Sequence, residues 1–146
     1  MAKKLDIYFA CSIRGFQGAH EEKALIVRLL KELGHNVLSE QFVNLTRENN
    51  EATQGMDEEM IYKRDLDWVK NSDIIVAHYS PSTGMGYEIG YKDAIGGRVL
   101  VLHKGELSSV TAMIQGNKKP TFKLHVWESE EDLKEYLKQE LGEVDQ

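Results

Sequence analysis

Two carboxylates, Asp65 and Glu88, are the residues of this chain with the clearest chemical potential. Cleavage of a bond to an anomeric carbon commonly uses such a pair, one group as nucleophile or charge stabiliser and the other as proton donor. The sequence predicts that a helix dipole keeps Glu88 ionised and that a partly apolar environment keeps Asp65 protonatable. The residues alone leave open whether the two side chains meet.

Asp65 lies on the apolar side of a predicted helix. Ile61 and Trp68 recur with it at helical spacing, so all three share one face. A carboxylate on that face needs a partner or has a raised pKa, and either condition suits general acid–base work. The alternative is a structural ion pair with Arg14 or Arg64.

Glu88 follows a glycine-rich junction between a predicted strand and a predicted helix. The apolar run Ile74–Ala77 reads as a buried strand, and Gly84 and Gly86 follow it. At such a junction free backbone N–H groups and the helix dipole favour an anion, and we place Glu88 in the first helical turn. The glycine spacing, which ends at Gly90, is one residue longer than the dinucleotide fingerprint, so we interpret the loop as a phosphate or sugar loop. A purely structural turn is the alternative.

Arg14 is the only cation in the loop after the first predicted strand. A guanidinium there could hold a phosphate or carboxylate with two hydrogen bonds, assisted by the Ser12 hydroxyl. An exposed surface arginine is the alternative.

The elements that must position these residues alternate between strand and helix. Strands are predicted at residues 5–10, 37–40, 73–78, 98–103 and 122–127; helices are predicted at 19–33 and 54–71, from the glycine-rich junction to residue 96, briefly around 110–115, and after Ser129. This order predicts an α/β fold: one domain over residues 1–146, a doubly wound (Rossmann-like) five-stranded parallel sheet with helices on both faces. Ligands of such sheets bind beyond the carboxyl ends of the strands, where Ser12, Arg14, Gln41 and Glu88 would gather.

Composition narrows the function classes. The net charge of −6 argues against a nucleic-acid-coating surface, and no apolar run approaches the roughly 20 residues of a membrane span. The single cysteine, Cys11, suits a reducing compartment, and the N-terminal residues lack a signal-peptide pattern, so we expect a cytoplasmic protein. The five histidines show no metal-ligand spacing, so we expect no metal and no cofactor.

Four stretches in register, at residues 8–15, 65–68, 82–90 and 112–116, resemble the 2′-deoxynucleoside 5′-phosphate N-hydrolases of the nucleoside 2-deoxyribosyltransferase superfamily. The resemblance runs from about residue 5 to residue 127. It implies hydrolysis of the N-glycosidic bond of a deoxynucleoside monophosphate, with free base and 2-deoxyribose 5-phosphate as products.

The resemblance also implies roles for individual residues. Glu88 matches the catalytic nucleophile, Asp65 matches the acidic residue near the base, and Thr111 falls where a serine reaches the phosphate from a neighbouring subunit, which implies a homodimer. Gln41 stands where related hydrolases carry a histidine near the base, so it bears on base preference. The substrate-binding set that the resemblance implies is Tyr8, Ser12, Ile13, Arg14, Gly15, Gln41, Ser82, Gly84, Gly86, Thr111, Ala112 and Met113.

Three alternative functions remain open at this point. A deoxyribosyltransferase would use a second base in place of water, although the predicted phosphate-binding residues argue against an unphosphorylated substrate. A ribonucleotide hydrolase acting on a CMP-like substrate would tolerate a 2′-hydroxyl. A non-catalytic nucleotide sensor would bind at the same rim without releasing the base.

Overall fold

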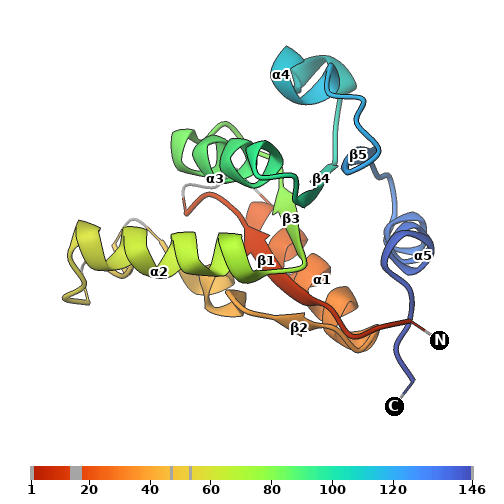
Figure 1. Ribbon diagram of the computed structural model, residues 1–146. Helices are drawn as coiled ribbons and strands as arrows, with labels where there is room; N and C mark the ends of the chain where they lie inside the picture. Colours follow the sequence, from red (N-terminus) through yellow and green to blue (C-terminus); the bar gives the residue numbers. More distant parts are fainter. Residues whose placement is uncertain (1, 14–17, 47, 53, 146) are drawn as a thin grey trace.

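The computed structural model shows an α/β fold and describes residues 2–13, 18–46, 48–52 and 54–145 (Figure 1). Its sheet has five parallel strands in the order β2-β1-β3-β4-β5, which confirms the predicted fold class. The strands are β1 (Asp6–Ala10), β2 (Asn36–Val37), β3 (Ile74–His78), β4 (Arg98–His103) and β5 (Phe122–Val126).

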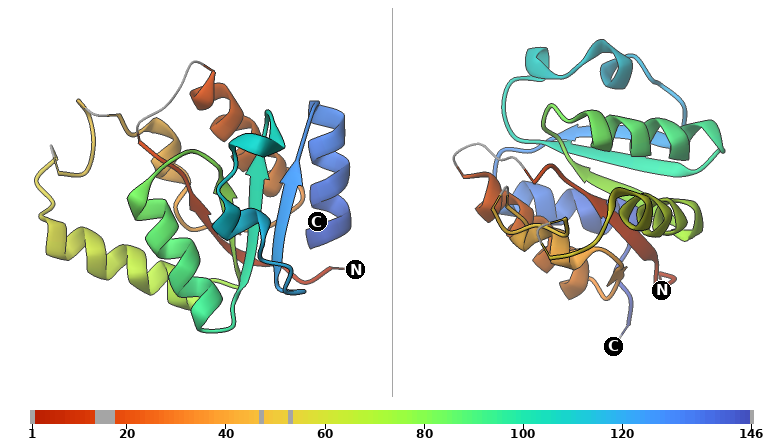
Figure 2. Two further views of the ribbon diagram at one scale, coloured as in Figure 1. Left: turned by 90° about the horizontal axis from the view of Figure 1, so that it is seen from above. Right: turned by 90° about the vertical axis from the view of Figure 1, so that its left-hand side faces the viewer.

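Helices cover both faces of the sheet (Figure 2). One face packs against α1 (Ala19–Glu32) and α5 (Glu130–Leu141), and the other packs against α2 (Glu58–Asn71), α3 (Thr83–Ala94) and the short α4 (Ala112–Gln115). The 3-10 helices η1 (Glu40–Asn44) and η2 (Leu107–Ser109) lie in connecting segments. Because side chains alternate along a strand, β1 sends Ile7 and Phe9 to the first core and Tyr8 and Ala10 to the second.

Side-chain caps fix where the helices begin. Asp57 accepts a hydrogen bond from the Met60 amide at 2.8 Å, and this cap starts α2 at Glu58 rather than at the predicted residue 54. Ser82 caps α3 by accepting from the Met85 amide at 3.3 Å. The Ser82 cap therefore fixes the start of α3 directly after the loop that follows β3.

The second strand is shorter than the predicted range 37–40. Pairing with β1 ends at Val37, because the Ser39 hydroxyl then takes over the backbone of β1: it accepts from the Phe9 amide and donates to the Phe9 carbonyl, both at 2.9 Å. The chain turns into η1 immediately afterwards. As a result, Phe42 is carried onto the face of the sheet that holds Tyr8.

The strand order creates a crevice between the loops that follow β1 and β3. These two strands are neighbours, but the chain continues from them toward opposite edges of the sheet, so their following loops separate. The helices on one side of the crevice are tied together by Lys92 of α3. Its buried ammonium donates to the carbonyls of Val69, Ser72 and Lys70 at 2.7, 2.6 and 3.4 Å, at the end of α2.

Candidate active site

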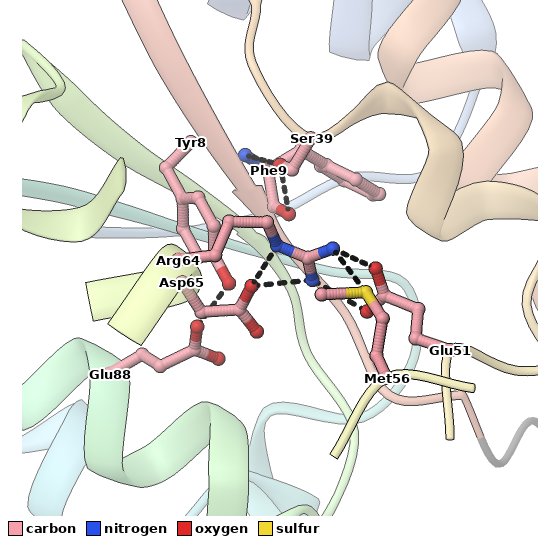
Figure 3. Close-up of polar contacts among 8 residues, drawn as sticks. All are labelled: Tyr8, Phe9, Ser39, Glu51, Met56, Arg64, Asp65 and Glu88. Carbon is pink, nitrogen blue, oxygen red and sulfur yellow. Dashed lines mark hydrogen bonds and ion pairs between the residues drawn. The ribbon is translucent and has the colours of Figure 1, made fainter. Parts of the chain in front are cut away.

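Glu88 and Tyr8 form a hydrogen-bonded pair at the carboxyl end of the sheet. Tyr8 rises from β1 with its side chain fully buried, and its hydroxyl donates to Glu88 Oε2 (Figure 3). The ring contacts Phe42 edge-on and a tilted Trp68 ring, at centroid distances of 5.9 and 6.2 Å. Burial, together with the charges of Glu88 and Asp65, raises the pKa of Tyr8 far above its ordinary value, so the phenol remains a hydrogen-bond donor.

The protonation state of Glu88 differs from the sequence-based prediction. Glu88 is the sixth residue of α3 and therefore lies in the second turn, beyond the first turn in which the dipole acts most strongly. Burial raises its pKa to about 7, the Tyr8 hydrogen bond opposes that rise, and the charge of Asp65 adds to it. The pKa of Glu88 therefore lies near neutral pH. The prediction that the helix dipole keeps Glu88 ionised was wrong, because desolvation outweighs the dipole.

Asp65 lies on the inner face of α2, as its spacing predicted, and it is paired. Arg64 Nε and NH2 both donate to Asp65 Oδ1, at 3.0 and 2.7 Å (Figure 3). Burial raises the pKa of the carboxyl, while the hydrogen bonds and charge of Arg64 lower it; the net direction is upward. The structural ion pair considered above therefore exists with Arg64, and it coexists with a raised pKa. Arg14 and Gly15 lie outside the described residues.

The crevice contains two cavities that meet at Glu88. The first, which we call the polar lobe, has a volume of about 580 Å³ and lies between the loops after β1 and β3. It is lined by Cys11, Ser12, Ile13, Pro81, Ser82, Thr83, Gly84, Met85 and Glu88. The second, the apolar lobe, has a volume of about 290 Å³ and lies under η1 and α2. It is lined by Tyr8, Cys11, Ile13, Phe42, Leu45, Asn50, Glu51, Ala52, Ile61, Asp65 and Glu88.

The polar lobe contains two of the residues that were predicted to hold the phosphate, Ser12 and Ser82. Ser12 and Ser82 line it from opposite sides, and the first amides of α3 open into it, where a helix start lacks intrahelical acceptors. The Lys23 ammonium donates to the Ser12 carbonyl at 2.6 Å and so fixes the end of the β1 loop. Gly84 lines the lobe, whereas Gly86 is exposed two residues further along α3 and is not among the described lining residues.

Two predicted groups lie outside both lobes. Gln41 is exposed on η1, and Phe42 lines the apolar lobe in its place, because the turn after Ser39 directs the neighbouring side chain inward. Thr111, Ala112 and Met113 are exposed on α4, and none of them is among the described residues that line either lobe. The Thr111 hydroxyl caps α4 by accepting from the Met113 amide at 3.4 Å.

The sequence-based prediction missed the wall of the apolar lobe between η1 and α2. Asn50, Glu51 and Ala52 belong to a polar stretch without periodicity, and none of them was predicted to line the site. The available signal was the apolar pair Phe42 and Leu45 inside that polar stretch. Buried hydrophobic residues in a loop indicate that the loop packs onto something.

Two kinds of feature are absent from the described part of the chain. It contains no group of three or more His, Cys, Asp or Glu side chains arranged to hold a metal ion. None of its helices is long and apolar enough to cross a membrane.

The sequence pattern of the nucleoside 2-deoxyribosyltransferase family matches residues 7–126. The chain belongs to this family. It is 37% identical over 118 residues to a provisionally named 2′-deoxynucleoside 5′-phosphate N-hydrolase of Trichoplax adhaerens. The match covers 80% of this chain and 78% of that protein. Mouse 5-hydroxymethyl-dUMP N-hydrolase is 34% identical over 114 residues, 75% of this chain; the match spans only 64% of the mouse protein's length.

The fold of this family member is shared with a solved structure, the CMP N-glycosidase of Clostridium botulinum. The two superpose with a TM-score of 0.67 over 93% of this chain and 99% of the other, at 17% sequence identity. At that identity the likeness concerns the fold. It places the five-stranded parallel sheet described above among the folds of enzymes of N-glycosyl bonds.

Proposed function

We propose that this protein hydrolyses the N-glycosidic bond of 2′-deoxynucleoside 5′-monophosphates, releasing free base and 2-deoxyribose 5-phosphate. The observation that carries the proposal is the position of Glu88 at the junction of a polar lobe and an apolar lobe. A nucleotide has the same order of parts: an anionic phosphate, a sugar whose C1′ is the reacting atom, and a flat base. The names of the two relatives, both deoxynucleotide N-hydrolases, support this substrate class.

In the first step, the ionised carboxylate of Glu88 attacks C1′ as the bond from C1′ to the base nitrogen breaks. The electron pair of that bond leaves with the base, and a glycosyl ester on Glu88 forms. Because burial brings the pKa of Glu88 to about 7, the nucleophilic carboxylate form is populated at neutral pH. Tyr8, hydrogen-bonded to Oε2, orients the carboxylate and stabilises its charge.

Asp65 supplies the proton that the departing base requires. Its carboxyl lines the apolar lobe, where the base would lie, and its pKa is raised by burial. After the base leaves, Asp65 as the carboxylate takes a proton from water, whose oxygen attacks C1′ and frees Glu88. Each proton and electron pair is thereby returned, and the enzyme regains its starting state.

The 5′-phosphate is assigned to the polar lobe. The hydroxyls of Ser12 and Ser82 and the first amides of α3 provide donors for its oxygens. Arg14, in the loop after β1, would add a guanidinium, as its sequence position predicts. Such contacts hold substrate and transition state alike, so they would act mainly on KM.

A homodimer is part of the proposal. Thr111, Ala112 and Met113 lie outside the cleft of their own chain and are exposed, with Met113 at 83% of its possible surface. A second copy would place the Thr111 hydroxyl near the phosphate of the neighbouring site. We assign the protein to the cytoplasm, since its single cysteine suits a reducing compartment.

The second candidate is base exchange, favoured by the name of the family itself. A deoxyribosyltransferase would form the same ester on Glu88 and resolve it with a second base instead of water. The polar lobe favours the hydrolase, because an unphosphorylated nucleoside would leave its hydroxyls and helix amides without an anion.

Base release from deoxynucleoside monophosphates, ribonucleoside monophosphates and unphosphorylated deoxynucleosides, followed by chromatography, tests both candidates. We expect release from deoxynucleoside monophosphates, and loss of release with retained binding in Glu88→Gln. Release that depends on added base, with that base incorporated, would assign the protein to the transferases. Full turnover in Glu88→Gln would remove Glu88 from the mechanism.

A further inference from the structure

Arg64 on α2 is the most heavily engaged side chain near the cleft, and the mechanism above does not use it. Its guanidinium donates to Glu51 Oε1 at 2.6 Å, also donates to Glu51 Oε2, and contacts the sulfur of Met56 at 3.5 Å. Two further hydrogen bonds reach Asp65 Oδ1, at 3.0 and 2.7 Å. One cation therefore bridges two carboxylates, and both of them line the apolar lobe.

The guanidinium also lies over the two aromatic rings that flank Tyr8. It lies 4.7 Å from the Trp68 ring and 5.6 Å from the Phe42 ring. Both rings contact Tyr8, whose hydroxyl binds Glu88. A planar group that stacks on rings while it donates along its edge has a fixed orientation, which a lysine could not reproduce.

The two oxygens of Asp65 are therefore not equivalent. Oδ1 accepts both hydrogen bonds from Arg64, and no residue of the described chain donates to Oδ2. Figure 3 shows the Asp65 carboxyl between the Arg64 guanidinium and Glu88, and this carboxyl lines the apolar lobe. A proton on Asp65 would thus be carried by Oδ2, because Oδ1 already faces a cation.

We propose that Arg64 is a positioning residue: it directs Oδ2 of Asp65 into the cleft and, through Glu51, fastens the segment between η1 and α2 as the wall of the apolar lobe. The inference rests on the proposed N-hydrolase function, in which Asp65 protonates the base. Arg64 touches neither the base nor C1′; it acts through the two carboxylates. One guanidinium thus holds both the wall of the apolar lobe and the carboxyl of the proposed acid.

The charges that face Asp65 set the sign of the expected effect. They are Arg64 on its own helix, Glu51 from the preceding segment, Glu88 from α3 and the neutral phenol of Tyr8 from β1. Arg64 lowers the pKa of Asp65, whereas burial and Glu51 raise it. Removing the cation therefore raises the pKa of Asp65 and frees the carboxyl to rotate.

The first test needs no activity. The carboxyl carbon of Asp65 is followed by NMR from pH 3 to pH 10 in the wild type, in Arg64→Gln and in Arg28→Gln. Arg28 is a matched control on α1, paired with Glu32 at 2.9 Å and Glu130 at 3.1 Å on an exposed surface. We expect Asp65 to titrate at higher pH in Arg64→Gln and to be unchanged in Arg28→Gln. An identical titration in all three proteins would overturn the proposal.

The second test is a double-mutant cycle on base release. Arg64→Gln should lower kcat on the order of 10²-fold, with a smaller effect on KM, since misplacing a catalytic group costs about that much. In an Asp65→Asn background the same substitution should lower kcat little further, because the effect of Arg64 on kcat passes through Asp65. Arg64→Lys, which keeps the charge but not the fork, should restore only part of kcat; full restoration would show that charge alone suffices and would refute the positioning role.

These outcomes separate the inference from the function on which it rests. Absence of base release in the wild type would refute the proposed hydrolase function. The NMR titration would still measure the interaction between Arg64 and Asp65. Base release with fully additive losses in the cycle would leave the hydrolase intact and overturn the role of Arg64. If Arg64→Gln does not fold, Glu51→Gln provides the same cycle, with the expectation that it lowers kcat through loosened contacts of Arg64.

Discussion

Replacing Glu88 by glutamine should stabilise the fold at alkaline pH. Burial raises the pKa of Glu88 from its ordinary value of 4.5 to about 7, so the folded state pays a desolvation cost whenever the carboxyl is ionised. Between these two pKa values the native state binds more protons than the unfolded state, and stability therefore falls as pH rises through that window. Glutamine removes the charge and still accepts the hydrogen bond from Tyr8.

The size of the effect follows from the two pKa values. Their difference of about 2.5 corresponds to about 3 kcal/mol when the carboxyl is fully ionised in both states, since each pKa unit is worth about 1.4 kcal/mol. At pH 5 the same linkage gives only about 1 kcal/mol. For a chain of this length, the gain at pH 8 raises Tm by on the order of 10 °C.

The assay is urea unfolding of the wild type and Glu88→Gln at pH 5 and pH 8. Glu135→Gln is a matched control, because Glu135 is exposed on α5, remote from the cleft. We expect the advantage of Glu88→Gln over the wild type to grow by about 2 kcal/mol from pH 5 to pH 8, and the control to stay within about 0.5 kcal/mol of the wild type at both. A Glu88→Gln advantage that does not change with pH would refute the assignment of a desolvated, near-neutral Glu88.

Three further predictions concern side chains around the cleft. Tyr8→Phe removes the hydrogen bond that lowers the pKa of Glu88, so the acid limb of base release against pH should move up by about one pH unit; an unmoved limb would show that the phenol does not stabilise the carboxylate. Ser82→Ala should destabilise the fold by about 1 kcal/mol through loss of the α3 cap and should raise KM for deoxynucleoside monophosphates; equal KM values for both proteins would remove Ser82 from the phosphate site. Lys92→Met removes the donor of the Ser72 carbonyl and one of two donors of the Val69 carbonyl, which keeps the Ser72 hydroxyl at 3.0 Å, and it should cost about 2 kcal/mol in thermal unfolding; a loss below about 0.5 kcal/mol would show that water replaces the ammonium.

The sequence predicted the fold because strand and helix periods alternate along the whole chain and chirality then leaves few topologies. It also predicted that Asp65 faces inward, since helical spacing relates that residue to apolar neighbours. Tyr8 came from the family resemblance alone: within an apolar strand, one tyrosine is indistinguishable from a core aromatic residue until the pairing of β1 with β3 places it beside Glu88.

The features that the sequence did not reveal share a physical cause, which is that they depend on tertiary contacts. The protonation of Glu88 is decided by burial beneath loops that the helix pattern does not reveal. The replacement of Gln41 by Phe42 as a lining residue depends on a bridge from Ser39 to β1, and no local propensity encodes it. The tie between Arg64 and Glu51 joins residues thirteen positions apart across an aperiodic segment.

The two lobes of the cleft come from separate stretches of the chain, and this separation has an evolutionary consequence. The polar lobe is made by the loops after β1 and β3, whereas the wall of the apolar lobe is made largely by η1, the segment after it and α2. In the proposed binding mode, substitutions, insertions or deletions in residues 41–57 would therefore alter which base is accepted while the polar lobe and Glu88 stay in place. Base preference is the trait that this architecture allows to diverge first, and grafting that one segment between family members is the direct route to exchanging it.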